Sequence, residues 1–164
     1  AHISVEENLR RIPPQSVDPT GKNYHWGDMT AALFNALDAG YDTTVLLNTN
    51  GYITEGPGFN IFAVIDGKVL TPRSGMLEGI SRKTVLEMCV ELGIPCAEAD
   101  ISLAEFLSAD ELFTATTAGG PVPVTRVNKT ILGNDAIGPI TAQVLKTYWD
   151  WHKRDELTEK ITYI

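Results

Sequence analysis

The stretch from Thr54 to Phe62, TEGPGFNIF, constrains the chain most, because it sets one carboxylate directly before a turn and an apolar strand. The glycines and the proline that follow Glu55 interrupt any regular element and predict a tight turn. Glu55 is therefore expected at the end of a strand running from Tyr52, where its side chain either accepts turn amides or faces a site. The remaining segments of the chain are interpreted by asking which of them the Glu55 carboxylate faces.

The residues before Glu55 predict two further strands and a helix. Ile3 and Val5 alternate with polar residues as in a strand, before two prolines force an extended or turning path. TTVLLN is expected to be a buried strand and NTNG a turn. Asp28 is predicted to be the N-cap of a helix that stops at Gly40. The apolar face of this helix comprises Ala32, Leu33, Ala36 and Leu37.

The residues after Glu55 predict a mixture of hairpins, strands and helices. FNIFAVIDGKVLTP should form a hairpin closed by Asp66 and Gly67. The segment MLEGISRKTVLEMCVELGIP has helical spacing, and its helix should begin near Gly79. PCAEADIS is expected to be a short strand, SLAE a capping box that opens a short helix, and ELFTATT and PVPVTRV two strands. A last amphipathic helix is expected from Gly138 to about Trp151.

This order of elements, without a regular βαβ alternation, predicts an α+β fold, and the composition predicts one domain over residues 1–164. A formal net charge of −8 disfavours nucleic acid and anionic membrane surfaces as partners. No apolar run could span a bilayer, and the first residues lack the order of a signal peptide, so a cytoplasmic location is expected. The two cysteines and three histidines predict neither a disulfide framework nor a zinc site.

Lys22, in GKNYHWGD, is a candidate nucleophile. Tyr24 and Trp26 are bulky neighbours that could shield it from water, and a shielded lysine has a lowered pKa and a free amine that can react with an aldehyde. The alternative is an ordinary solvated loop lysine. Glu55 likewise has two interpretations, a turn carboxylate or an acceptor that keeps a ring nitrogen protonated so that the ring acts as an electron sink.

Two segments offer donors for an anion. Gly79, Ile80 and Ser81 open a helix whose first amides have no intrahelical partner, and a glycine lets an anion approach the backbone. Thr116 and Thr117 offer hydroxyls before Ala118, Gly119 and Gly120. Either segment could instead be a simple turn, so each alone is a weak signal.

Taken together, KNYHWGD, TEGPGFNIF, GMLEGISRKT and TATTAGGPVPVTR resemble the class IV aminotransferases, the pyridoxal-phosphate enzymes of fold type IV, in order and spacing. Within that family the segments look most like the (R)-selective amine transaminases. The resemblance implies that the cofactor is pyridoxal 5'-phosphate, that Lys22 forms the Schiff base, and that Glu55 binds the pyridine nitrogen, with Asn60 supporting it. It also implies that Leu77 packs on the ring, and that the phosphate is held by Gly79, Ile80, Ser81, Thr116 and Thr117.

The resemblance covers only the C-terminal, large-domain part of such an enzyme, a pseudo-barrel of mixed strands with flanking helices. It implies a small N-terminal domain in front of Ala1, with pocket residues and a phosphate-binding arginine that this chain does not match, and a homodimer. The implied reaction passes an amino group from a chiral (R)-amine or an amino acid to a 2-oxo acid. Three alternatives stay open: a branched-chain or D-amino acid aminotransferase, a 4-amino-4-deoxychorismate lyase-like enzyme, and a non-catalytic fragment that acts as a dimerisation module.

Overall fold

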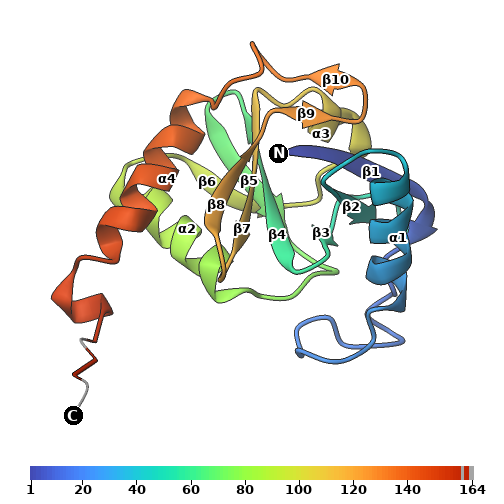
Figure 1. Ribbon diagram of the computed structural model, residues 1–164, viewed down its shortest axis with the longest axis horizontal. Coiled ribbons are helices and arrows are strands. Elements are labelled where there is room, and N and C mark those ends of the chain that lie inside the picture. The colour runs from blue at the N-terminus through green and yellow to red at the C-terminus, as the bar shows by residue number, and fades with distance from the viewer. Residues whose placement is uncertain (160, 163–164) are drawn as a thin grey trace.

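Two mixed β-sheets share one hydrophobic core in the computed structural model, which describes residues 1–159 and 161–162 (Figure 1). The large sheet has the order β6 (Cys96–Ala99), β5 (Lys68–Pro72), β4 (Phe59–Ile65), β7 (Glu111–Thr116) and β8 (Gly120–Val124), with β3 (Glu55–Gly56) paired to β4. The small sheet has the order β10 (Thr130–Ile131), β9 (Arg126–Val127), β1 (His2–Arg10) and β2 (Thr43–Leu47).

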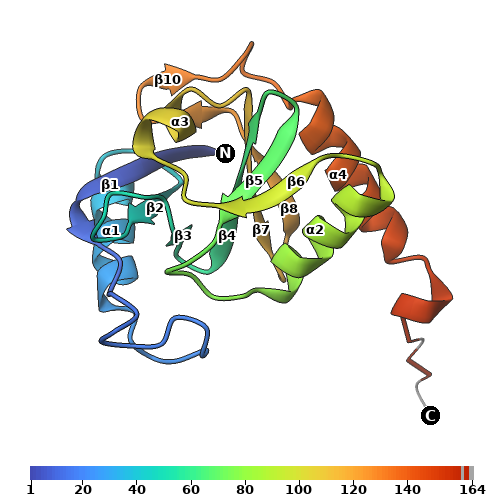
Figure 2. The same ribbon diagram turned by 180° about the vertical axis from the view of Figure 1, so that it is seen from behind.

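Helices cover the outer faces of the two sheets. In both views α2 (Ile80–Glu91) and α4 (Pro139–Trp151) lie side by side against the large sheet, whereas α1 (Gly27–Asp38) flanks the small one (Figures 1 and 2). The short α3 (Leu103–Leu107) and a 3₁₀ turn, Asp155–Leu157, complete the elements. The capping box predicted for α3 is present, because Ser102 and Glu105 each bond the other's backbone amide. The predicted α+β class is confirmed.

Strand β4 is apolar along nearly its whole length because both of its faces are covered. Ile61 and Ala63 point into the core shared by the two sheets. Phe62 and Val64 point to the other side, into a second cluster beneath α2 and α4, where Phe62 stacks on Phe113 with ring centroids 4.7 Å apart. β4 is therefore packed between two layers.

The predicted hairpin between β4 and β5 is confirmed. Asp66 and Gly67 have φ values of 50° and 73°, the two positive angles of the turn that matches strand twist. The predicted strand from Tyr52 to Glu55 is wrong. Tyr52 and Ile53 make only isolated bridges, and Glu55 instead begins β3 by pairing with Asn60 on β4. The carboxylate thus sits at the start of a tight hairpin rather than at the end of a strand.

The predicted strand PVPVTRV is confirmed only in its first part, because the segment is divided between the two sheets. β8 ends at Val124, and β9 begins at Arg126 on the edge of β1. The amide of Thr125 between them donates to the carbonyl of Ala1 at 3.0 Å. This crossing strand connects the large sheet to the small one and closes their shared core on one side.

Helix α1 starts differently from the prediction. Trp26 is the N-cap, and it makes no side-chain capping bond. Asp28 lies inside the first turn, where its carboxylate accepts the Ile12 amide at 2.7 Å instead of capping the helix. The buried face comprises Met29, Ala32 and Ala36, whereas Leu37, predicted to be on the apolar face, is 49% exposed. Tertiary contacts with the end of β1 therefore replace the local cap that the sequence suggested.

Candidate active site

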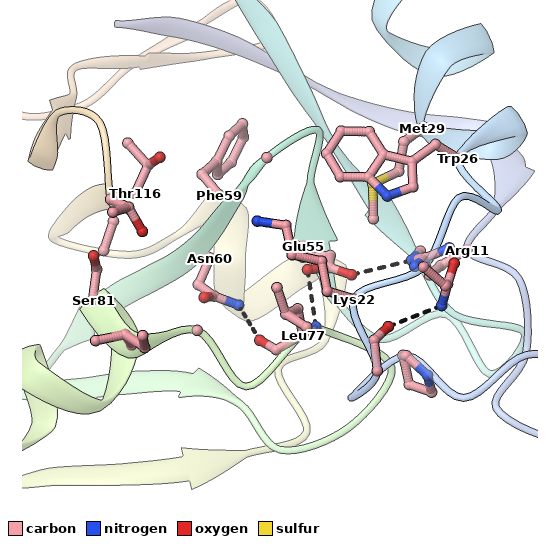
Figure 3. A pocket seen from close by; sticks show the side chains of 18 residues that line it. Arg11, Lys22, Trp26, Met29, Glu55, Phe59, Asn60, Leu77, Ser81 and Thr116 are labelled. Atoms are coloured by element: carbon pink, nitrogen blue, oxygen red, sulfur yellow. Dashed lines mark hydrogen bonds and ion pairs between the residues drawn. The ribbon is translucent and has the colours of Figure 1, made fainter.

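One cavity brings together every residue that the sequence singled out for a cofactor role (Figure 3). Its lining comes from the segment between β1 and α1, the β3–β4 hairpin, the start of α2 and the end of β7. In Figure 3, Ser81 and Thr116 occupy one end of the lining and Arg11 the other, with Lys22 and Glu55 between them. The predicted residues on this lining are Lys22, Glu55, Asn60, Leu77, Gly79, Ile80, Ser81, Thr116 and Thr117.

Glu55 is a buried carboxylate with defined partners, exposed by only 4%. One oxygen accepts the Leu77 amide at 3.0 Å, and the other accepts Nε of Arg11 at 3.2 Å. Burial raises the pKa of Glu55 above its usual value, and the Leu77 hydrogen bond and the Arg11 charge offset this only in part. The site therefore holds an oriented acid that binds a proton more readily than an exposed glutamate.

Leu77 and Asn60 form the support beneath Glu55. The Asn60 side-chain amide donates to the Leu77 carbonyl at 2.8 Å, while the amide of the same Leu77 donates to Glu55. Asn60 is also the direct ladder partner of Glu55. Asn60 can therefore support Glu55 through hydrogen bonds to the peptide groups of Leu77. The sequence did not predict this indirect connection.

Gly79 is the N-cap of α2, and its lack of a side chain leaves room for the side chain of Asn60. A Cβ on Gly79 would lie 2.3 Å from Oδ1 of Asn60, far inside contact distance. The helix begins at Ile80 without a side-chain cap, so its first amides are available to an anion. The Ile80 side chain itself is 81% exposed, whereas Ser81 is buried against the cavity. Ile80 can therefore contribute through its backbone and Ser81 through its hydroxyl as well.

Thr116 and Thr117 lie where β7 ends, on the cavity lining. Gly120 does not line the cavity. It has a φ of 63°, and a Cβ there would lie 2.5 Å from Cε1 of Tyr148 on α4. Gly120 is therefore needed for the packing of α4, whereas the two threonines face the site.

Lys22 reaches the cavity from an exposed segment. The predicted shielding is wrong for this chain, because Tyr24 is fully exposed and Trp26 is 39% exposed. The segment is ordered instead by Asn23, whose side-chain amide donates to the carbonyls of Asp18 and Gly21, at 3.1 and 2.9 Å. Asn23 also accepts the His25 amide at 2.9 Å. The hydrogen bonds of Asn23, rather than cover by bulky side chains, therefore order the segment that carries Lys22.

Arg11 is the residue that sequence reasoning missed. Its side chain is 4% exposed and lies between two carboxylates, with Nη1 2.7 Å from Asp28 and Nε 3.2 Å from Glu55. The only sequence signal was its place after the predicted strand, and the pairing of β1 shifts register between Glu6 and Arg10. The alternation of side chains along β1 therefore could not predict on which face of the sheet the Arg11 side chain lies.

Comparison with known proteins identifies the family. The family described as Amino-transferase class IV matches residues 3–127. The chain therefore belongs to the class IV aminotransferases. A branched-chain-amino-acid aminotransferase of Salmonella typhimurium is 37% identical over 151 residues, which are 89% of this chain and 48% of that protein.

Solved structures agree with this assignment. A branched-chain aminotransferase from Thermoproteus uzoniensis, crystallised with norvaline, superposes with a TM-score of 0.88 at 32% identity, covering 95% of this chain and 53% of that one. The enzyme from Thermobaculum terrenum in its PLP form gives 0.87 at 32% identity, covering 92% and 50%. The predicted fold is confirmed, and the chain spans about half the length of these relatives.

Two further findings concern membrane helices and metal ions. Within residues 1–159 and 161–162, no helix is both long and apolar enough to cross a membrane. The same residues contain no cluster of three or more histidine, cysteine or acidic side chains that could bind a metal ion.

Proposed function

We propose that this chain forms the cofactor-binding part of a pyridoxal-phosphate-dependent aminotransferase. The observation that carries the proposal is the joint lining of one cavity by Lys22, the buried Glu55 and the free N-terminus of α2. These three features match an aldehyde, a ring nitrogen and a phosphate, which are the three functional parts of this cofactor. Family membership supports the same conclusion.

The donor set fits the cofactor. The unpaired first amides of α2 favour an anion, and the hydroxyls of Ser81, Thr116 and Thr117 add donors at the same end. Glu55 lies away from that end, where a carboxylate can accept a hydrogen bond from a protonated pyridine nitrogen. When bound, the cofactor supplies an aldehyde that takes up the amino group and a ring that withdraws electrons from the substrate carbon.

The chain's own residues would then share the work. Lys22 would bind the cofactor aldehyde and, when displaced by the donor amine, carry the proton between the substrate carbon and C4' of the cofactor. Glu55, held by Leu77 and Arg11, would keep the pyridine nitrogen protonated. The Leu77 side chain would pack on the ring, and its position is set by the hydrogen bonds of its own peptide groups.

The proposed substrates are an amino donor and a 2-oxo acid, exchanged in two half-reactions. The names of the relatives support branched-chain amino acids as donors. The likeness of NYHWGD, GFNI and TTAGG to the (R)-selective amine transaminases favours (R)-amines as the second candidate. A screen of L-leucine, D-alanine and both enantiomers of 1-phenylethylamine, with pyruvate and a branched-chain 2-oxo acid as acceptors, decides between them. Consumption of L-leucine alone assigns the chain to the branched-chain group.

We also propose that the active protein contains a further small domain and acts as a homodimer. The relatives are about twice as long as this chain, which supports an additional part. The only arginine on the cavity lining, within the residues described, is already paired with Glu55 and Asp28. A phosphate-binding arginine would therefore come from elsewhere. Cofactor retention after gel filtration, compared between residues 1–164 and a longer parent, measures what the additional part contributes.

Attachment of the cofactor to Lys22 is the direct test of the proposed function. Borohydride reduction of the cofactor-loaded protein, followed by peptide mass spectrometry, should place the cofactor mass on the peptide that contains Lys22. Lys22→Met should abolish this label, whereas Lys68→Met, at the exposed start of β5, should keep it. Labelling of another lysine, or none, would contradict the proposal.

A further inference from the structure

Arg11 contacts a second carboxylate, Asp28, besides Glu55. It follows β1 directly, and its backbone amide donates to the Leu47 carbonyl on β2 at 2.8 Å, so its position is set by the small sheet. Its guanidinium reaches the cavity lining but is turned toward two carboxylates. A buried guanidinium with two acidic partners is an arrangement that fixes charges in place.

The first carboxylate, Asp28, closes the base of the segment that carries Lys22. One Asp28 oxygen accepts both Nη1 of Arg11 and the Ile12 amide, each at 2.7 Å. Ile12 lies near the start of the segment between β1 and α1, Asp28 lies in the first turn of α1 just after it, and Lys22 lies between them. The Arg11–Asp28 pair therefore joins the two ends of the Lys22 segment.

The second carboxylate, Glu55, is held by the same guanidinium through Nε at 3.2 Å. The charged groups that act on Glu55 are Arg11 after β1 and Asp28 in α1, and Lys22 lines the same cavity. Asp28 disfavours a second negative charge nearby, and burial does the same. Arg11 is thus the buried cation that opposes both effects.

We propose that Arg11 is a positioning residue that keeps Glu55 ionised and oriented and, through Asp28, ties the Lys22 segment to that same carboxylate. One guanidinium then sets the relative placement of the two groups that act on opposite sides of the cofactor. Its importance at the cofactor ring rests on the proposed function. The contacts themselves involve only residues of this chain, so the test is made on protein freed of cofactor and is independent of cofactor attachment to Lys22.

The primary experiment is a titration of Glu55 in cofactor-free protein, by ¹³C NMR of labelled glutamate carboxyls assigned with Glu55→Gln. Removing an opposite charge within contact distance raises a carboxyl pKa by about 1–3 units. Arg11→Met should therefore shift the Glu55 titration upward by at least about one unit. Arg11→Lys should give a smaller upward shift than Arg11→Met, because lysine keeps the charge but cannot reach both carboxylates equally well.

The matched control is Arg10→Met, which removes the same charge from the neighbouring, exposed arginine. It should leave the Glu55 titration unchanged. Hydrogen exchange gives a second readout, since amides from Asp18 to Trp26 should exchange faster in Arg11→Met than in Arg10→Met. Equal Glu55 titration in these two variants, or equal exchange of the segment, would overturn the proposal.

Arg11→Met leaves two buried carboxylates without their cation and could fail to fold. Arg11→Met combined with Asp28→Asn removes one charge of each sign and keeps the measurement possible. Compared with Asp28→Asn alone, this double variant should still show the upward shift of the Glu55 titration. An unchanged titration in that comparison would also overturn the proposal.

Discussion

Glu55 and Asp28 share the guanidinium of Arg11, yet their pKa values shift in opposite directions. Burial is the largest influence on both carboxyls. For Glu55, it outweighs the hydrogen bonds and raises the pKa. For Asp28, the bonds from the Ile12 amide, the Arg11 guanidinium and the Met29 amide outweigh burial, and the pKa is lowered. The difference arises because Asp28 accepts more donors and is less buried than Glu55. It predicts opposite effects of pH on stability.

Glu55→Gln should become more stable relative to wild type as pH rises. A folded-state pKa above the unfolded value of 4.5 means that wild type loses stability as pH climbs from about 4.5 through the folded value. The glutamine variant has no such loss. Thermal unfolding of cofactor-free protein between about pH 4 and pH 8 measures the difference in melting temperature. A difference that stays constant across this range would contradict the raised pKa.

Asp28→Asn should behave in the reverse way. Its folded-state pKa lies below the unfolded value of 3.8, so its stabilising contribution is complete above that value and is lost as pH falls through the folded pKa. The variant should be less stable than wild type near neutral pH by about 1–3 kcal/mol, because a charge-assisted pair is removed. Urea unfolding at neutral pH and at about pH 3 should show the gap narrowing in acid. A gap that widened in acid would be inconsistent with this assignment.

At the scale of elements, the start of α2 depends on a fit between a glycine and an asparagine. Because a Cβ at Gly79 would meet Oδ1 of Asn60 at 2.3 Å, the asparagine side chain or the helix start must move when a methyl is added. The Asn60 bond to Leu77, and with it the support of Glu55, would be disturbed by that movement. The position of the first α2 amides is thus coupled to that of the Glu55 carboxylate.

Gly79→Ala should weaken cofactor binding by about tenfold or more, corresponding to about 1.4 kcal/mol or more. The measurement is a fluorescence titration of cofactor-free protein with pyridoxal phosphate. Adding Asn60→Ala to Gly79→Ala removes the clash and should recover part of the affinity lost by the glycine change. Gly93→Ala, at the far end of α2, provides a control, since its added Cβ meets no atom within 4 Å although its φ of 67° is strained. Equal affinities for Gly79→Ala and wild type would show that the close approach is unimportant.

At the scale of the whole molecule, α4 is attached to the large sheet by a distant carboxylate. Glu111, at the start of β7, accepts the amides of Ile140 and Thr141 at the start of α4, at 3.0 and 2.7 Å. The helix has no side-chain cap of its own. α4 also packs Val144 and Tyr148 into the cluster behind the site-bearing strands. One carboxylate therefore satisfies the helix end and anchors the layer that supports β4 and β7.

Glu111→Gln should destabilise the protein by about 1–2 kcal/mol, because a neutral amide loses the attraction to the helix N-terminus and one of its two acceptor oxygens. Urea unfolding measures the change in the free energy of unfolding. Glu87→Gln, at a 54% exposed position of α2, is the control and should change stability by less than about 0.5 kcal/mol. Equal effects of the two substitutions would argue against the anchoring role.

Local sequence alone determined most elements of this protein. The hairpin at Asp66 and Gly67, the capping box at Ser102 and the starts of α2 and α4 follow from residue chemistry within a few positions, and each is present. The sequence motifs also selected residues that come together around one cavity, although their individual roles stay predictions. These features were accessible because turns, caps and glycine-opened helices depend on neighbouring residues.

Only the tertiary structure decided the rest. The division of PVPVTRV between two sheets, the parallel pairing of β1 with β2 and β9, and the burial of Arg11 depend on residues far away in the chain. Asp28 looked like a helix cap because its partners at the end of β1 are 16 and 17 residues away. A buried charge is tolerated only where opposite charges meet it, and which charges meet is set by packing.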